Sequence, residues 1–172
     1  MRKILVIISI LFVCIFISFA KEINRTFYGL TFHTSYKIVR WHLGKEKHKV
    51  LEEDQSIVMY DNVRIGGFNF DNATLSFYND LWKSVVYSSG HINKDQAIDK
   101  FNTIKNALTL KYDMYVLKED TDIIIFEDDR TGIILYWEYG ESRGGKMFYY
   151  VTLSYYDKNL SDKQFQKEQD EL

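Results

Sequence analysis

Residues 140–146 (GESRGGK) have the spacing of a phosphate-binding loop. In such a loop a Ser or Thr follows the lysine and ligates Mg²⁺, and backbone amides at the start of a helix hold the phosphates. Here Met147 occupies the position of the hydroxyl residue, and the residues after it predict a strand instead of a helix. We therefore interpret this segment as the loop of a β-hairpin.

The histidines could serve as metal ligands or as general bases. The chain has four of them: His33, His42, His48 and His91. His42 and His48 are six residues apart, which is not the spacing of a zinc-binding helix. His91 follows Ser88-Ser89-Gly90, but the G-x-S-x-G motif of a nucleophilic serine is absent. The sequence predicts no catalytic residue, no metal ligand and no cofactor.

Carboxylates are clustered near two predicted loops. The run Glu127-Asp128-Asp129 could attract Ca²⁺, but it lacks the spaced ligands and the bidentate glutamate of a calcium-binding loop. Glu138 and Glu141 could form the carboxylate pair of a glycoside hydrolase, which depends on their separation in space. An envelope or extracellular hydrolase, with a site assembled from histidines and carboxylates, is therefore our alternative functional hypothesis.

Aromatic residues make up 16% of the chain, and most of them are expected in the core. The alternating segment 146–156 would place Tyr150 and Thr152 on one face of a strand. We predict that an exposed aromatic face of a sheet binds a protein or glycan partner, without catalysis. The predicted binding residues are Tyr150, Thr152, Tyr156 and Trp82.

The elements that would position these residues occur twice. Residues 50–62 (VLEEDQSIVMYDN) and 116–128 (VLKEDTDIIIFED) match at an offset of 66 residues. The same offset, without a gap, pairs Gly66 with Gly132 and Trp82 with Phe148. Self-similarity of this kind predicts two copies of one structural unit, at about 35–88 and 94–156.

Each unit is predicted to be a helix followed by four strands. The helices are expected at 35–43 and 93–111, the second with Asn93 as its N-cap. Strands are expected at 56–60, 63–68, 73–78 and 82–88, and again at 114–118, 122–127, 133–139 and 146–156. Turns are expected at Asp61-Asn62 and Asn79-Asp80, and a bulge or a close backbone approach at Gly66-Gly67.

The fold class that follows is α+β. Strands linked by hairpins pair antiparallel, and two helices on one face would leave the other face open. On the first helix we expect Ile38, Trp41 and His42 to lie on one side. A single domain at 21–156 is expected, and residues 157–172 should form a polar, frayed tail.

Residues 1–20 have the pattern of a secretory signal. Arg2 and Lys3 precede a long apolar run that ends in Ser18-Phe19-Ala20, so cleavage is expected after Ala20. An uncleaved membrane anchor is an alternative, as is lipidation of Cys14, although a lipidated cysteine should end the apolar run and this one does not. We expect a periplasmic or secreted protein with no membrane span after cleavage.

The net charge of the chain after cleavage bears on which class of partner it binds. Without Arg2 and Lys3 the chain carries 20 basic and 24 acidic residues, a net charge of −4. This charge gives no reason to expect nucleic acid as a partner. Cys14 is the only cysteine, so no disulfide is expected in the mature chain, and its oligomeric state is left open.

The segment Phe27-Tyr28-Gly29-Leu30, with Gly66-Gly67-Phe68 and Lys111-Tyr112, resembles a group of small exported proteins of Bacteroidetes-type bacteria. The resemblance covers most of residues 27–156. The doubled helix-plus-sheet plan is similar to beta-lactamase inhibitor protein and to SmpA-type outer-membrane assembly lipoproteins. That similarity implies binding rather than catalysis. The chain departs from the lipoproteins at Val13-Cys14 and from the inhibitor in lacking disulfides after cleavage.

Overall fold

The computed structural model describes residues 22–45, 48–141 and 145–171. The fold is α+β, with one eight-stranded antiparallel sheet, a two-stranded sheet and three helices in the described residues. The predicted signal at 1–20 lies outside them. Before the large sheet come β1 (Thr26–Phe27), β2 (Leu30–Thr31) and α2 (Tyr36–Lys45). The first four strands of the large sheet are β3 (Val50–Glu53), β4 (Ile57–Ile65), β5 (Phe68–Tyr78) and β6 (Leu81–His91).

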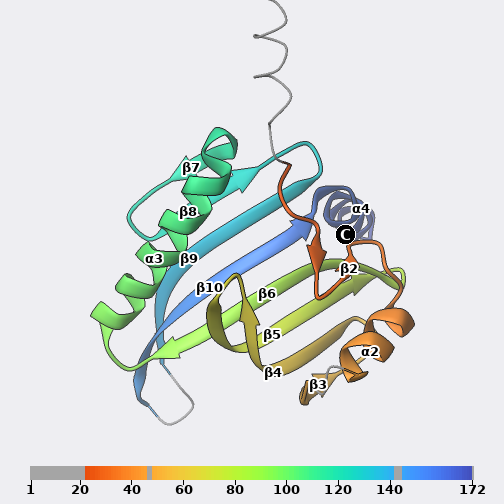
Figure 1. The fold of residues 1–172 in the computed structure, drawn as a ribbon. Coiled ribbons are helices and arrows are strands. Elements are labelled where there is room, and N and C mark those ends of the chain that lie inside the picture. The colour runs from red at the N-terminus through yellow and green to blue at the C-terminus, as the bar shows by residue number, and fades with distance from the viewer. Residues whose placement is uncertain (1–21, 46–47, 142–144, 172) are drawn as a thin grey trace, which may run out of the picture.

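The second half of the chain begins with α3 (Lys94–Tyr112) and a 3-10 turn, η1 (Asp113–Tyr115). Its strands are β7 (Val116–Glu119), β8 (Ile123–Glu127), β9 (Thr131–Glu141) and β10 (Met147–Asp157), followed by α4 (Lys158–Asp170). The strand order is β3-β4-β5-β6-β10-β9-β8-β7, so the last strands of the two halves meet at the centre of the sheet (Figure 1).

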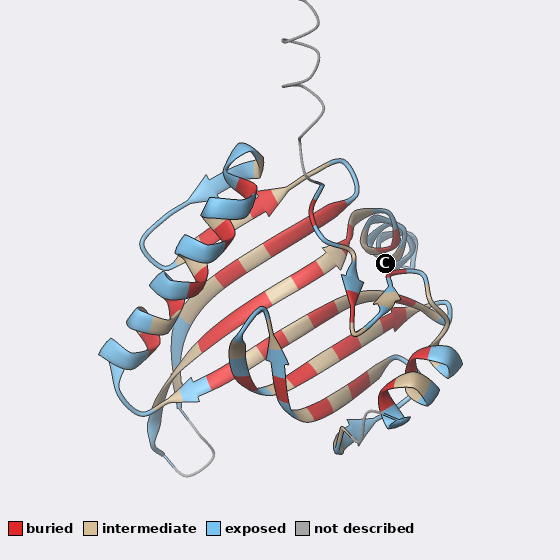
Figure 2. Cartoon of the chain, in the orientation of Figure 1, coloured by how far each residue is buried: buried red, intermediate tan, exposed pale blue. Residues whose placement is uncertain are grey.

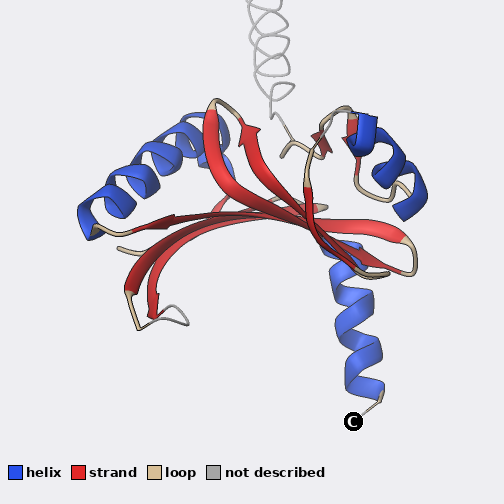
Figure 3. Ribbon diagram, turned by 90° about the horizontal axis from the view of Figure 1, so that it is seen from below, coloured by secondary structure: helices blue, strands red, loops and turns tan. Residues whose placement is uncertain are grey.

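The helices lie on both faces of the sheet. Seen from below, α2 and α3 lie on one side and α4 projects from the other (Figure 3). The prediction of a frayed tail is wrong, because α4 forms there and the Asp157 side chain accepts a hydrogen bond from the Leu160 N–H at 2.9 Å as its N-cap. The N-cap predicted for α3 is confirmed, since the Asn93 side chain accepts from the Asp95 N–H at 2.7 Å.

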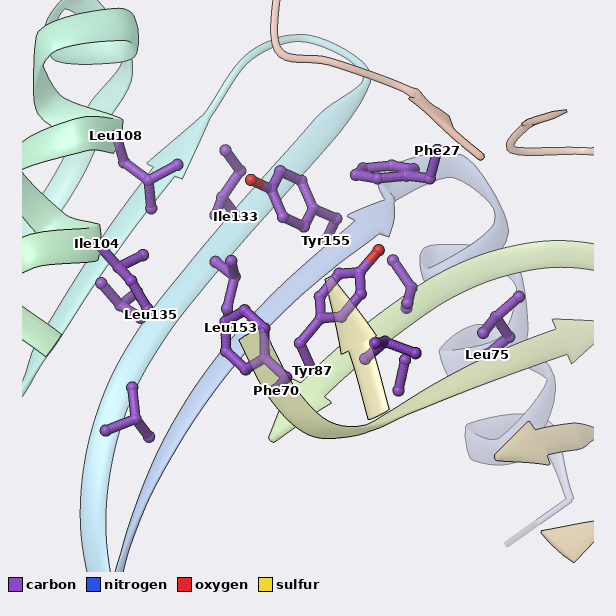
Figure 4. Close-up of a cluster of buried hydrophobic side chains, with 14 of the residues drawn as sticks. Phe27, Phe70, Leu75, Tyr87, Ile104, Leu108, Ile133, Leu135, Leu153 and Tyr155 are labelled. Carbon is purple, nitrogen blue, oxygen red and sulfur yellow. The ribbon is translucent and has the colours of Figure 1, made fainter. Parts of the chain in front are cut away.

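The core lies between the sheet and the layer formed by α2, α3 and the N-terminal segment. Alternate residues along the strands are buried, which gives the banded pattern of Figure 2. Figure 4 shows Ile104 and Leu108 of α3 pointing toward Leu153 and Tyr155 of β10. On α2 the predicted side is wrong: Val39 and Leu43 are buried, whereas Ile38 and Trp41 are exposed.

The first hairpin departs from the prediction. The chain passes through Asp61-Asn62 as part of β4, with Asn62 at a φ of +49° where the pairing with β5 skips one residue. The turn lies instead at Gly66-Gly67, whose φ values of +57° and +89° suit glycine. The predicted turn at Asn79-Asp80 is confirmed, with φ values of +50° and +65°.

The two halves share a register at the sheet edges. Val50 pairs with Tyr60 and Val116 with Phe126, and a bulge follows each pair. Beyond this point the predicted offset of 66 is wrong. Leu75 pairs with Val85 and Leu135 with Leu153, so β5 and β9 correspond at an offset of 60 residues and β6 and β10 at 68.

Candidate binding face

The sheet face opposite α2 and α3 carries a continuous cross-strand row of six side chains. From β4 to β8 the row is Met59, Thr74, Val86, Ser154, Ile134 and Ile125, each paired with the next. Their neighbours along each strand are buried in the core, so these six residues point to the other face. All six are half-buried. We call them the central row.

More polar rows run on both sides of the central row. On one side the residues are Asp61, Asn72, Ser88, Thr152, Tyr136 and Ile123. On the other side they are Ile57, Ser76, Ser84, Tyr156, Gly132 and Glu127. The face therefore has an aliphatic centre bordered by hydroxyl, amide and carboxylate groups.

Tyr150 lies on this face, as predicted, and two glycines flank its ring. A methyl group added to Gly90 would lie 3.6 Å from one edge of the ring, and one added to Gly140 would lie 3.5 Å from the other. Neither glycine has a positive φ, so the backbone conformation requires glycine at neither position. The half-buried ring of Tyr150 therefore lies beside a glycine of each neighbouring strand.

Tyr156 lies on the same face but near the base of α4. A methyl group added to Gly132 would lie 2.0 Å from the Tyr156 ring, so the ring covers that glycine. The Tyr156 hydroxyl is 3.3 Å from Oε1 of Glu127, which also receives an ion pair from Lys158 of α4 at 3.2 Å. Burial, followed by the negative charge of Glu127, raises the pKa of Tyr156 to about 12.

Thr152 and Trp82 are less accessible than the sequence predicts. Thr152 belongs to the face but is only 5% exposed among its neighbours. Trp82 is fully buried on the core side, against Phe27 and Phe32, and its indole N–H donates to the Ser84 carbonyl at 2.8 Å. Lys83 of β6 is an extra residue opposite Ser76 and Phe77, and this bulge shifts the pairing of β5 with β6 and turns Trp82 to the core. Its assignment to the binding face is therefore wrong.

Helix α4 forms a wall at one end of the face. Figure 3 shows it projecting from the sheet, with the β9–β10 hairpin curving down at the other end. Leu160 is buried at the base of α4, and the Tyr78 hydroxyl lies 3.5 Å from the Lys163 carbonyl. The open face is therefore bounded at both ends, although the hairpin loop residues 142–144 lie outside the described residues.

Two of the histidines that could support hydrolysis lie far apart in the described residues. His42 lies on α2, whereas His91 ends β6 beside the start of α3, at the other side of the sheet (Figure 1). Near His91, Lys100 Nζ donates to Ser89 Oγ and to the Asn69 carbonyl, both at 2.5 Å. Burial lowers the pKa of Lys100, but Ser89 is only 2% exposed and cannot reach a substrate.

Sequence reasoning missed a buried charge cluster at the start of α4. Asp157 is 1% exposed, and its Oδ2 atom accepts from Arg25 Nη2 at 2.5 Å and His33 Nε2 at 3.0 Å. Burial opposes ionisation, but hydrogen bonds from the Leu160 N–H, Arg25 and His33 outweigh it and hold the pKa of Asp157 below its usual value. Nothing in the local sequence links residues so far apart.

The described residues contain neither a cluster of metal ligands nor a membrane-spanning helix. No group of three or more His, Cys, Asp or Glu side chains there could hold a metal ion. None of the described helices is long and apolar enough to cross a membrane. At the loop that resembles a phosphate site, β10 begins at Met147, so a strand follows as expected.

No protein-family model, curated protein or solved structure matches this chain. The candidate binding face is therefore defined by the geometry of the chain alone.

Proposed function

We propose that the protein is a non-catalytic binding module whose open sheet face receives a protein partner. The central row carries this proposal, because four of its six side chains are apolar: Met59, Val86, Ile134 and Ile125. Apolar side chains at the centre of a patch with polar residues at the rim are the usual arrangement of a protein interface.

The size of the face suits such a partner. Six strands spaced at about 4.8 Å span roughly 29 Å, and the three rows extend about 20 Å along the strands. The resulting area of about 600 Å² is at the lower end of the range for one side of a standard interface. Helix α4 has 13 residues and projects about 20 Å from its start. We expect this wall to prevent two flat copies from meeting and to favour a smaller partner domain that fits beside it.

A glycan partner is disfavoured by the chemistry of the central row. Sugar hydroxyls need hydrogen-bonding groups, and only Thr74 and Ser154 among the six side chains of the row provide them. The ring of Tyr150 between its two glycines could stack on a sugar, but it lies at one end of the face. A partner protein would use the tyrosine as a peripheral anchor and the aliphatic row as the core of the contact.

Site-specific photo-crosslinking in the native cell envelope would test the proposal. A photo-reactive phenylalanine analogue replaces Ile134 on the open face, and a second variant carries it at Leu110, which is 91% exposed on α3. We expect one discrete crosslinked species from position 134 and none from position 110. The substitution Val86→Arg should remove that species while the protein stays folded.

The opposite results would contradict the proposal. These are equal crosslinking from both positions, or an unchanged crosslinked species in the Val86→Arg variant. A crosslink only to polysaccharide would favour the glycan partner instead.

We further propose that the two halves arose by duplication. The equal register and bulge of β3–β4 and β7–β8 support this idea. So do equivalent ion pairs between helix and edge strand, in which Arg40 binds Glu53 and Lys105 binds Glu119. The resemblance to beta-lactamase inhibitor protein and SmpA-type lipoproteins, and export directed by residues 1–20, are proposals that depend on the sequence.

A further inference from the structure

An apolar cavity of about 270 Å³ lies on the core side of the sheet, between α3 and the β4–β5 hairpin. Leu153 and Tyr155 of β10 form its floor. Ile104 and Leu108 of α3 form one wall, and Figure 4 shows both pointing toward that floor. The lining is therefore mainly aliphatic and aromatic, as in most small-molecule sites.

The β4–β5 hairpin forms the roof of this cavity. Its tip contributes Ile65, Gly66 and Phe68, and Figure 1 shows the hairpin curling over the sheet. In the second half of the chain β8 ends at Glu127 and β9 begins at Thr131, so the corresponding hairpin is shorter. The roof is thus longer than the corresponding hairpin of the second half.

One cationic group stands at the mouth of the cavity. Lys111 lines the site, and its Nζ lies 4.8 Å from the centre of the Tyr112 ring. Within the part of the chain that the structure describes, no carboxylate pairs with this ammonium group. Ala107 is exposed beside it on α3. The site therefore combines an apolar interior with an unneutralised positive charge at its entrance.

We propose that this cavity binds a small amphiphilic anion, with its apolar tail between α3 and the hairpin and its carboxylate at Lys111. An apolar cavity of about 150 Å³ is known to accept benzene, so by proportion this one has room for a tail of about ten carbons. An ion pair at a partly exposed lysine adds modest affinity and selects the sign of the head group. This ligand site is separate from the open face proposed to bind a partner.

Octanoate, octanol and octylammonium are the probes, titrated into the folded protein and followed by amide NMR shifts. We expect saturable one-to-one binding of octanoate with shifts confined to 62–70, 104–112 and 153–155. Lys111→Gln should weaken octanoate binding about threefold to fivefold and leave octanol binding unchanged. Ala107→Phe should block the mouth and abolish binding of both.

The matched control is Asn106→Phe, which adds the same ring one position away on the exposed side of α3. This variant should bind octanoate like the unchanged protein, and circular dichroism should show that both phenylalanine variants are folded. The proposal is overturned if no probe binds saturably, if octylammonium binds as tightly as octanoate, or if the two phenylalanine variants lose binding equally.

Discussion

The Arg25 Nη2 atom lies 2.5 Å from the Asp157 Oδ2 atom, although 132 residues separate them in the chain. This ion pair ties the segment before β1 to the residue that caps α4. Arg25 also donates from Nη1 to the Thr131 hydroxyl at 3.0 Å and to the Arg130 carbonyl at 3.1 Å. The N-terminal segment, the start of β9 and the start of α4 are thereby held at one point, and α4 is fixed as a wall of the open face.

Replacing Asp157 with asparagine should therefore be strongly destabilising. The change leaves the largely buried Arg25 without its counter-ion, and breaking such a pair costs about 3 kcal/mol or more of the free energy of unfolding. Urea unfolding of the variant measures the loss. Asp170→Asn, at an exposed position of α4, is the control and should change stability by less than about 0.5 kcal/mol. Equal stability of the two variants would show that the pair contributes nothing.

Asp157 should also make the free energy of unfolding depend on pH. The pKa of Asp157 is lower in the folded state than in the unfolded chain, so its contribution is fully present above the unfolded value, near 3.8. It should be lost as the pH falls from there through the folded pKa. Unfolding free energies measured between pH 2 and 6 should fall less steeply for Asp157→Asn. Parallel curves for the two proteins would refute this assignment.

Tyr156 should make the free energy of unfolding fall as the pH rises into the alkaline range, which is the opposite of the effect of Asp157. Its pKa is raised from 10.0 to about 12, so the folded state favours the neutral phenol. The resulting stabilisation is present below pH 10 and is lost as the pH rises toward 12. Absorbance at the tyrosinate band should show one fewer late-titrating group in Tyr156→Phe. An unchanged late titration in that variant would place the raised pKa elsewhere.

Gly132 should tolerate alanine poorly, whereas Gly140 should tolerate it well. A methyl group on Gly132 would lie 2.0 Å from the Tyr156 ring and would displace it from Glu127. We expect a loss of about 1–2 kcal/mol, in the range of an overpacked site. At Gly140 the nearest ring atom would lie at 3.5 Å, an ordinary contact. Thermal unfolding of the two alanine variants measures the difference, and equal midpoints would contradict it.

Local sequence signals allowed a large part of the fold to be predicted, because hydrophobic alternation and turn residues report local structure. The α+β class, the antiparallel strands and the N-cap Asn93 follow from such local signals. The position of the first turn does not follow from local signals. Asp61-Asn62 and Gly66-Gly67 both favour turns, and only the pairing with β5 decides between them.

The candidate site was predicted less completely. The alternation of β10 placed Tyr150 on the open face, but exposure depends on neighbours that the strand sequence does not reveal. Gly132 brings Tyr156 down onto the sheet, and α4 starts beside it. The wall formed by α4 was missed because its sequence is polar and only Leu160 is buried, so no hydrophobic period marks it.

Tryptophan fluorescence should separate the buried and exposed indoles. Trp82 is fully buried, whereas Trp41 is 62% exposed on α2 with Lys45 Nζ 3.6 Å from its ring centre. Acrylamide should therefore quench Trp41 and leave Trp82 almost unquenched. In a background in which the half-buried Trp137 is replaced by phenylalanine, we expect Trp41→Phe to remove most of the quenchable emission and Trp82→Phe to remove the blue-shifted, protected component. If Trp82→Phe instead abolished the quenchable emission, Trp82 would lie on the exposed face of the sheet. Strict alternation along β6, without the bulge opposite Ser76 and Phe77, predicts that position.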